Sequence, residues 1–124
     1  MKVTFTSFLV FISSILFAQS PGSLDTTFGV GGKVLTSVNT LVEKAYGVVI
    51  QTDGKLVIAG YASSAITGKD FICVRYNTNG SLDNTFGAGG IVTTDLQLGS
   101  DDIAYGLALQ TDGKIVAAGY SDDG

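Results

Sequence analysis

The sequence contains no histidine, no tryptophan and only one cysteine. The absence of histidine excludes a zinc centre of the usual His/Cys type and a catalytic triad that relies on histidine. A single cysteine cannot form a disulfide within the chain. Seven lysines and arginines against eleven aspartates and glutamates give a net charge of −4, which excludes a basic surface for nucleic acid.

Apolar residues and glycine are abundant instead. Of the 124 residues, 45% are apolar and 15% are charged, and 17 are glycine. This length allows at most one ordinary domain, and this composition is typical of folded rather than disordered chains.

Residues 1–18 have the pattern of a secretory signal peptide. A positive start at Lys2 is followed by an apolar run over Phe8–Phe17, and cleavage could follow Ala18 or Ser20. The run is about half as long as a membrane span requires. No cysteine follows either cleavage point to accept a lipid anchor. We therefore expect the mature chain to be exported, with no membrane insertion once the signal is removed.

The rest of the chain is an internal repeat. GSLDTTFG at Gly22–Gly29 returns as GSLDNTFG at Gly80–Gly87, 58 residues later. AYGVVIQTDGKLVIAGYAS at 45–63 and AYGLALQTDGKIVAAGYSD at 104–122 agree at 12 of 19 positions. The sequence therefore predicts a first repeat, or blade, over 19–79 and a second, truncated one over 80–124.

Both units are predicted to be all-β, because their apolar runs are short, β-branched and separated by glycine. Asp53-Gly54 and Asp112-Gly113 stand between two such runs, and Asp-Gly is the signature of a type I′ hairpin turn. A two-residue turn predicts a register by counting outward. In the first unit it pairs Tyr46 with Tyr61 and Gly47 with Gly60, leaving a slot without side chains beside the tyrosines.

Two further strands complete each unit. They are predicted over 33–38 and its counterpart 91–96, and over 71–77. Four antiparallel strands in about 58 residues favour a β-propeller blade, with a right-handed β-solenoid as the alternative. A propeller needs about four to eight blades, so we expect this chain to be an N-terminal fragment with fewer than two.

The motifs SLDTTFG, QTDGKLVIAGY, DFICVRYNTNGSLDNTFG and ALQTDGKIVAAGY resemble the delta-60 repeat, over nearly all of 22–122. This resemblance implies an uncharacterised bacterial repeat of propeller type, found in exported proteins of Bacteroidetes-like bacteria. It implies secretion or attachment at the outer surface of a Gram-negative cell. It supplies no catalytic residues, so the recurring Asp, Gly and Tyr positions are interpreted as fold determinants.

Asp25 and Asp83 recur inside the SLDxTFG element, where oxygen ligands could hold calcium. Asp beside Ser and Thr in a glycine-flanked turn more often accepts backbone N–H bonds, as in an Asx-turn. Calcium loops of known types place several carboxylates at every second residue, whereas each element here has one. The sequence therefore favours the Asx-turn.

The other candidates also have a structural interpretation that we prefer. Asp101-Asp102 and Asp122-Asp123 could act as paired carboxylates on a glycan, but the matching places of the first unit lack such pairs, which indicates variable loops. Lys55 and Lys114 follow the turn glycine and could activate a hydroxyl, but a solvated hairpin lysine is commoner.

We also expect structural roles for Arg75, Cys73 and the glycine clusters. We expect Arg75 to have a buried carboxylate partner or a contact between blades, and Cys73 to be a buried, inert thiol. Gly29, Gly31-Gly32, Gly87 and Gly89-Gly90 are expected to form tight turns rather than a phosphate-binding loop. The sequence thus predicts no catalytic, cofactor-binding or metal-binding residue and no cofactor.

The leading functional hypothesis is an exported, cell-surface β-propeller segment that acts as a scaffold or binding module without catalysis. Its partner would be an extracellular protein or glycan, and Tyr46, Tyr61, Tyr105 and Tyr120 could stack on sugars if exposed. Further repeats of the same chain, or self-association, would close the propeller. One alternative is a propeller enzyme acting on extracellular glycans, with its active site outside this fragment. Another is a repeat stabilised by bound ions.

Overall fold

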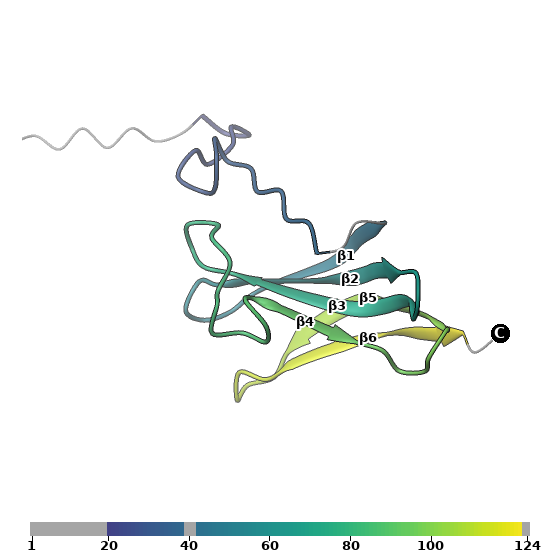
Figure 1. The fold of residues 1–124 in the computed structure, drawn as a ribbon. Coiled ribbons are helices and arrows are strands. Elements are labelled where there is room, and N and C mark those ends of the chain that lie inside the picture. Colours follow the sequence, from purple (N-terminus) through teal and green to yellow (C-terminus); the bar gives the residue numbers. More distant parts are fainter. Residues whose placement is uncertain (1–19, 39–41, 123–124) are drawn as a thin grey trace, which may run out of the picture.

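The computed structural model describes residues 20–38 and 42–122. The described chain is all-β (Figure 1). Its strands are β1 (Glu43–Ile50), β2 (Leu56–Ser64), β3 (Gly68–Tyr76), β4 (Ile91–Thr94), β5 (Asp101–Leu109) and β6 (Ile115–Asp122). The predicted signal peptide at 1–18 lies outside the described residues. Within the described ranges, no helix is long and apolar enough to cross a membrane.

The first four strands pair in chain order. β1 pairs with β2, β2 with β3 and β3 with β4, all antiparallel, and β5 and β6 form a second hairpin that repeats β1 and β2. One parallel pair, Lys69 with Asp101, joins β3 to β5, so that the six strands form one open sheet. Four antiparallel strands followed by the hairpin of a next unit are the arrangement expected of neighbouring propeller blades. The predicted all-β, propeller-like fold is confirmed as a partial propeller.

The four-stranded unit is offset from the sequence repeat. β4 follows the SLDNTFG element, yet it pairs back with β3, which precedes that element, placing Val92 opposite Cys73. The counterpart of β4, predicted as a strand over 33–38, is not a strand, and only an isolated bridge joins Gly29 to Lys33. That prediction is wrong because no counterpart of FICVRYN precedes 33–38 to serve as its partner strand.

The turn between β1 and β2 is longer than the sequence predicts. The Gln51 N–H donates to Lys55 O at 2.8 Å, which leaves three residues in the loop. Gly54 has a φ of 83°, but among the described residues only glycines have a positive φ, so Asp53 does not adopt the conformation that a type I′ turn requires. A three-residue loop with glycine in the left-handed conformation replaces it, and Ile50 therefore pairs with Leu56.

A bulge shifts the register again at Tyr46. Tyr46 has no partner residue on β2, while Ala45 pairs with Gly60 and Gly47 pairs with Ala59. The predicted tyrosine pair and glycine pair are therefore wrong. The bulge brings the Lys44 carbonyl so close to Gly60 that a Cβ there would overlap its oxygen. The second unit has the same bulge at Tyr105, and there Gly119 lies equally close to the Ile103 carbonyl.

The core lies on both faces of β2 and β3. On one face Ala62, Ile72, Val74 and Tyr76 form a buried cluster, onto which apolar residues of the flanking segments pack. On the other face Val57 is fully buried. The centre of the sheet is thus covered on both faces. Strand β1 differs, because it exposes apolar side chains along its length.

Candidate functional site

Asp83, in the second SLDxTFG element, is buried and held by four donors. Its Oδ2 accepts hydrogen bonds from Lys55 Nζ at 2.9 Å and Arg75 Nε at 2.8 Å. Its Oδ1 accepts from the N–H and the hydroxyl of Thr85, at 3.1 and 2.7 Å. The pKa of the Asp83 carboxyl lies far below its ordinary value. The hydrogen bond from Lys55 is the main cause, and the bonds from Thr85 and the positive charge of Arg75 add to it. Both oxygens are occupied by protein donors, which satisfies this carboxylate without a metal.

The Asx-turn interpretation is therefore confirmed for both SLDxTFG elements. Asp25 Oδ1 accepts from the Thr27 N–H at 2.9 Å and from the Thr27 hydroxyl at 2.6 Å, which lowers the pKa of Asp25. Arg75 has the buried carboxylate partner that was expected, and its guanidinium lies 4.5 Å from the centre of the Phe86 ring.

The two turn lysines differ from each other. Lys114 pairs with Asp112 of its own turn and is exposed, in line with a solvated lysine. Lys55 does not match that expectation, because its ammonium group bonds the buried Asp83.

The paired aspartates separate onto different partners. Asp101 and Asp102 begin strand β5, so their assignment to a variable loop is wrong. Asp101 pairs with Lys69, whereas Asp102 is fully buried. Asp122 ends β6 opposite Asp101, and Asp123 lies outside the described residues.

Cys73 and the glycine clusters have structural roles. Cys73 is only partly buried, so the prediction of a buried thiol is wrong in this respect. Its partial burial still raises the pKa of the thiol, which reduces the thiolate fraction and favours low reactivity. The six clustered glycines all have positive φ, and the Gly90 N–H closes a turn on Phe86 O at 2.8 Å. The tight-turn interpretation is confirmed.

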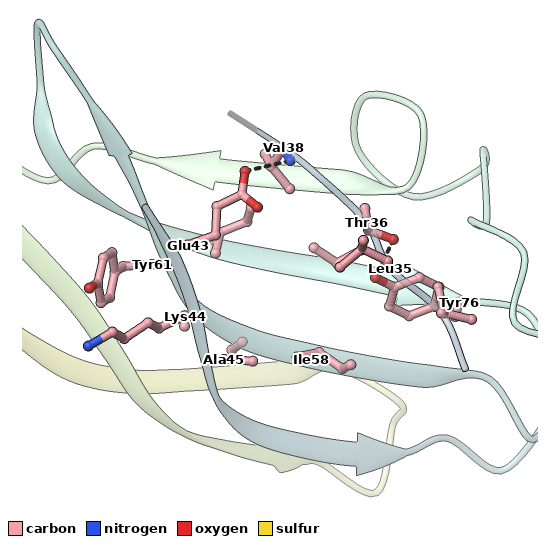
Figure 2. Close-up of a pocket in the computed structure, with 14 residues that line it drawn as sticks. Leu35, Thr36, Val38, Glu43, Lys44, Ala45, Ile58, Tyr61 and Tyr76 are labelled. Carbon is pink, nitrogen blue, oxygen red and sulfur yellow. Dashed lines mark hydrogen bonds between the residues drawn. The ribbon is translucent and has the colours of Figure 1, made fainter. Parts of the chain in front are cut away.

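A pocket lies between the segment that precedes β1 and the face of β1, β2 and β3 (Figure 2). Its volume is about 290 Å³, and apolar side chains including Leu35 and Ile58 line most of it. Two hydrogen bonds fix the segment over the sheet: the Tyr76 hydroxyl donates to Thr36 Oγ1 at 2.8 Å, and the Val38 N–H donates to Glu43 Oε1 at 2.7 Å. The polar groups of these two bonds hold the segment before β1 against the sheet, and they do not point toward a common position in the pocket where a substrate atom could react.

Four tyrosines form a continuous row across the two hairpins. The ring centres of Tyr61 and Tyr46 are 6.2 Å apart, those of Tyr46 and Tyr105 are 5.1 Å apart, and those of Tyr105 and Tyr120 are 6.2 Å apart. The bulges make this row, because they turn Tyr46 and Tyr105 out of the strand pairing. Tyr46, Tyr105 and Tyr120 are 46%, 52% and 42% exposed, while Tyr61 is buried.

Three carboxylates that the sequence does not link also come together. Asp70 of β3, Asp95 just after β4 and Asp102 of β5 each place an oxygen within 4.8 Å of the other two. The Leu96 N–H and the Ser100 hydroxyl donate to Asp102, at 2.7 and 2.8 Å. Burial raises the pKa of Asp102, but these bonds, with further ones from Ser121 and the Gln97 backbone, outweigh it and lower that pKa.

Sequence reasoning missed this cluster because its members come from three separate elements. One signal could have indicated part of it: an acid precedes each AYG motif at the same place, Glu43 in the first unit and Asp102 in the second. Both acids accept a backbone N–H from the end of the preceding segment, at 2.7 Å in each case.

Comparison with known protein families gives a match to part of the chain. Residues 51–86 match the family described as "Domain of unknown function (DUF5122) beta-propeller". The matched segment runs from the β1–β2 turn through β3 to the second SLDxTFG element. It supports a β-propeller repeat. No curated protein and no solved structure matches the chain significantly.

Proposed function

We propose that this chain is part of an exported β-propeller of the delta-60 type that binds extracellular glycans at its tyrosine row and performs no chemistry on them. The observation that carries the proposal is the row itself. Tyr46, Tyr105 and Tyr120 neighbour one another in this row and remain substantially exposed. Exposed aromatic surface of this kind marks interaction sites, and tyrosine combines an apolar ring with a polar tip.

The charged groups support a non-catalytic role. Among the described residues, the recurring ones are used in contacts that hold the fold: Asp83 with Lys55 and Arg75, and Asp25 with Thr27. A glycosidase needs two carboxyl groups facing each other across open space. Of the three carboxylates that lie close together here, Asp70 and Asp102 are buried, so they do not face each other across open space.

Export is supported by the sequence pattern of residues 1–18. Removal of Lys2 leaves six basic against eleven acidic residues, so the mature chain would carry a net charge of −5. A neutral glycan suits such a surface better than a polyanion.

The test uses the mature chain with all the repeats that its reading frame encodes. Electrophoresis in gels that contain soluble mannan, xylan, starch or β-glucan would measure retardation. We expect retardation by at least one of them. The double variant Tyr46→Ala/Tyr105→Ala should weaken it at least tenfold, and Tyr46→Phe/Tyr105→Phe should retain most of it because the rings remain.

Thermal melting of each variant would separate lost binding from lost folding. Equal retardation of the wild type and a folded alanine variant would overturn the assignment of the tyrosine row, and so would no retardation on the whole panel. Release of reducing ends from a polysaccharide by the purified protein would overturn the non-catalytic role and favour the enzyme alternative.

A further inference from the structure

We propose that Asp70, Asp95 and Asp102 bind a divalent cation, with Ca²⁺ as the preferred ion, and that this ion ties the first four-stranded unit to the next hairpin.

The first argument is an unsatisfied buried oxygen. Asp70 is 6% exposed, and its Oδ2 accepts a hydrogen bond from the Thr67 hydroxyl at 2.7 Å. Its Oδ1 is buried and has no hydrogen-bond partner. A buried carboxylate oxygen without a donor is costly, and a metal ion is one of the few groups that satisfies it.

The second argument is the accumulation of like charge. Each of the three carboxylates places an oxygen within 4.8 Å of the others, and Asp102 is fully buried. Among the described residues, no ion pair includes any of the three, and the nearby Lys69 is paired with Asp101 instead. Carboxylates this close repel one another strongly unless a cation or a proton lies between them.

The ligand set favours calcium. Ca²⁺ binds oxygen at about 2.3–2.6 Å, so two oxygens on one ion lie up to about 5 Å apart, and three oxygens within 4.8 Å of one another are compatible with one ion. Mg²⁺ demands near-octahedral geometry, keeps several waters and usually takes only one or two carboxylates, whereas Ca²⁺ accepts three carboxylates in a flexible arrangement. Exposure of Asp95 leaves an open side through which the ion can enter and water can complete its coordination.

The position of the cluster gives the ion a structural role. Its ligands come from β3, from the end of β4 and from β5, beside the parallel pair of Lys69 with Asp101 that joins β3 to β5. An ion there would add a direct link between these strands to the existing contacts of the two units, which include the Lys69–Asp101 ion pair. The first unit carries Glu43 and Ser37 at the places of Asp102 and Asp95. A β3-like strand of another repeat would bring the counterpart of Asp70 to them.

The test measures cation binding directly, without any glycan. The mature protein is stripped with EDTA, and terbium luminescence and differential scanning calorimetry are recorded as Tb³⁺ or Ca²⁺ is added. We expect Ca²⁺ to raise the melting temperature and to displace Tb³⁺, with a Kd of about 10⁻⁴–10⁻³ M, as in extracellular calcium modules. Mg²⁺ should have a weaker effect at the same concentration.

Variants assign the site to these residues. Asp95→Asn alters an exposed side chain and should not impair folding, and Asp70→Asn preserves the shape and the bond from Thr67. Each should remove one bound ion per chain or weaken its binding at least tenfold. Asp101→Asn, next to the cluster but paired with Lys69, is the matched control and should retain the ion. No calcium-dependent shift in the wild type, or the same ion count in all variants, would overturn the proposal.

Discussion

Lys55 Nζ lies 2.9 Å from Asp83 Oδ2, although the two residues are 28 positions apart in the sequence. The pair links the hairpin turn of β1 and β2 to the SLDNTFG element beyond β3. Lys55 is only part-exposed and Asp83 is buried, so the contact is not a loose surface ion pair. It gives Lys55 and Asp83 a joint role in holding the hairpin turn against this element.

The Asp83 carboxylate should make folding stability depend on acid pH. Its pKa in the folded protein lies below the ordinary value of 3.8, so the unfolded chain binds more protons between the two values. The stabilisation is therefore complete above about pH 4 and is lost as the pH falls through the folded-state pKa. Urea unfolding between pH 2.5 and 6 would measure it.

We expect Asp83→Asn to flatten this acid-side slope and to lower the melting temperature at pH 7. Asp25→Asn is the matched control, because Asp25 makes the same turn without Lys or Arg partners and is exposed. It should change both quantities less. An equal effect of the two variants would contradict a special role for the ion pairs.

Gly60 should be the most sensitive glycine of the first hairpin. A Cβ there would overlap the Lys44 carbonyl at the bulge, which must then shift. Gly60→Ala should cost about 1–3 kcal/mol, the usual range for overpacking. At Gly47 a Cβ would lie 3.3 Å from the Leu107 nitrogen, a tight but tolerable contact, so Gly47→Ala should cost less. Chemical denaturation of both variants checks the order, and the reverse order would argue against the bulge.

Cys73 should react slowly with thiol reagents in the folded protein. Burial raises the pKa of its thiol, so less thiolate is present at pH 8 than for a free cysteine. We expect labelling by a disulfide reagent to be at least tenfold slower than in the protein unfolded in urea, and to accelerate as the pH rises. Labelling at the same rate in both states would show that the side chain is accessible.

Much of the fold could be predicted because the repeat presents the same signals twice. The apolar runs, the Asp-Gly turns and the SLDxTFG elements placed the two hairpins and the Asx-turns correctly. The register could not be predicted in the same way. Asp-Gly suits both a two-residue turn with Asp at positive φ and a three-residue loop in which only glycine is left-handed, and this choice shifts every pair along the strands.

The bulge and the acidic cluster depend on tertiary contacts. Nothing local to Tyr46 marks it as a bulge residue, because the bulge is a shift in the pairing of β1 with β2, a different strand of the chain. The cluster combines one residue from each of three elements, so no spacing along the chain shows it. The sequence gives one partial signal: an acidic residue stands two positions before each AYG motif, Glu43 in the first unit and Asp102 in the second. This recurrence indicates a structural role for Asp102, one of the three cluster residues.

The return of β4 to pair with β3 also affects how such a protein can grow. Because the sequence repeat and the four-stranded unit share a length but not a starting point, the chain has no privileged boundary between modules. A gene duplication of about one repeat can begin inside a strand, a turn or a loop and still insert one whole blade. Lineages with such repeats can therefore change blade number through unequal recombination at almost any point, without evolving new linkers.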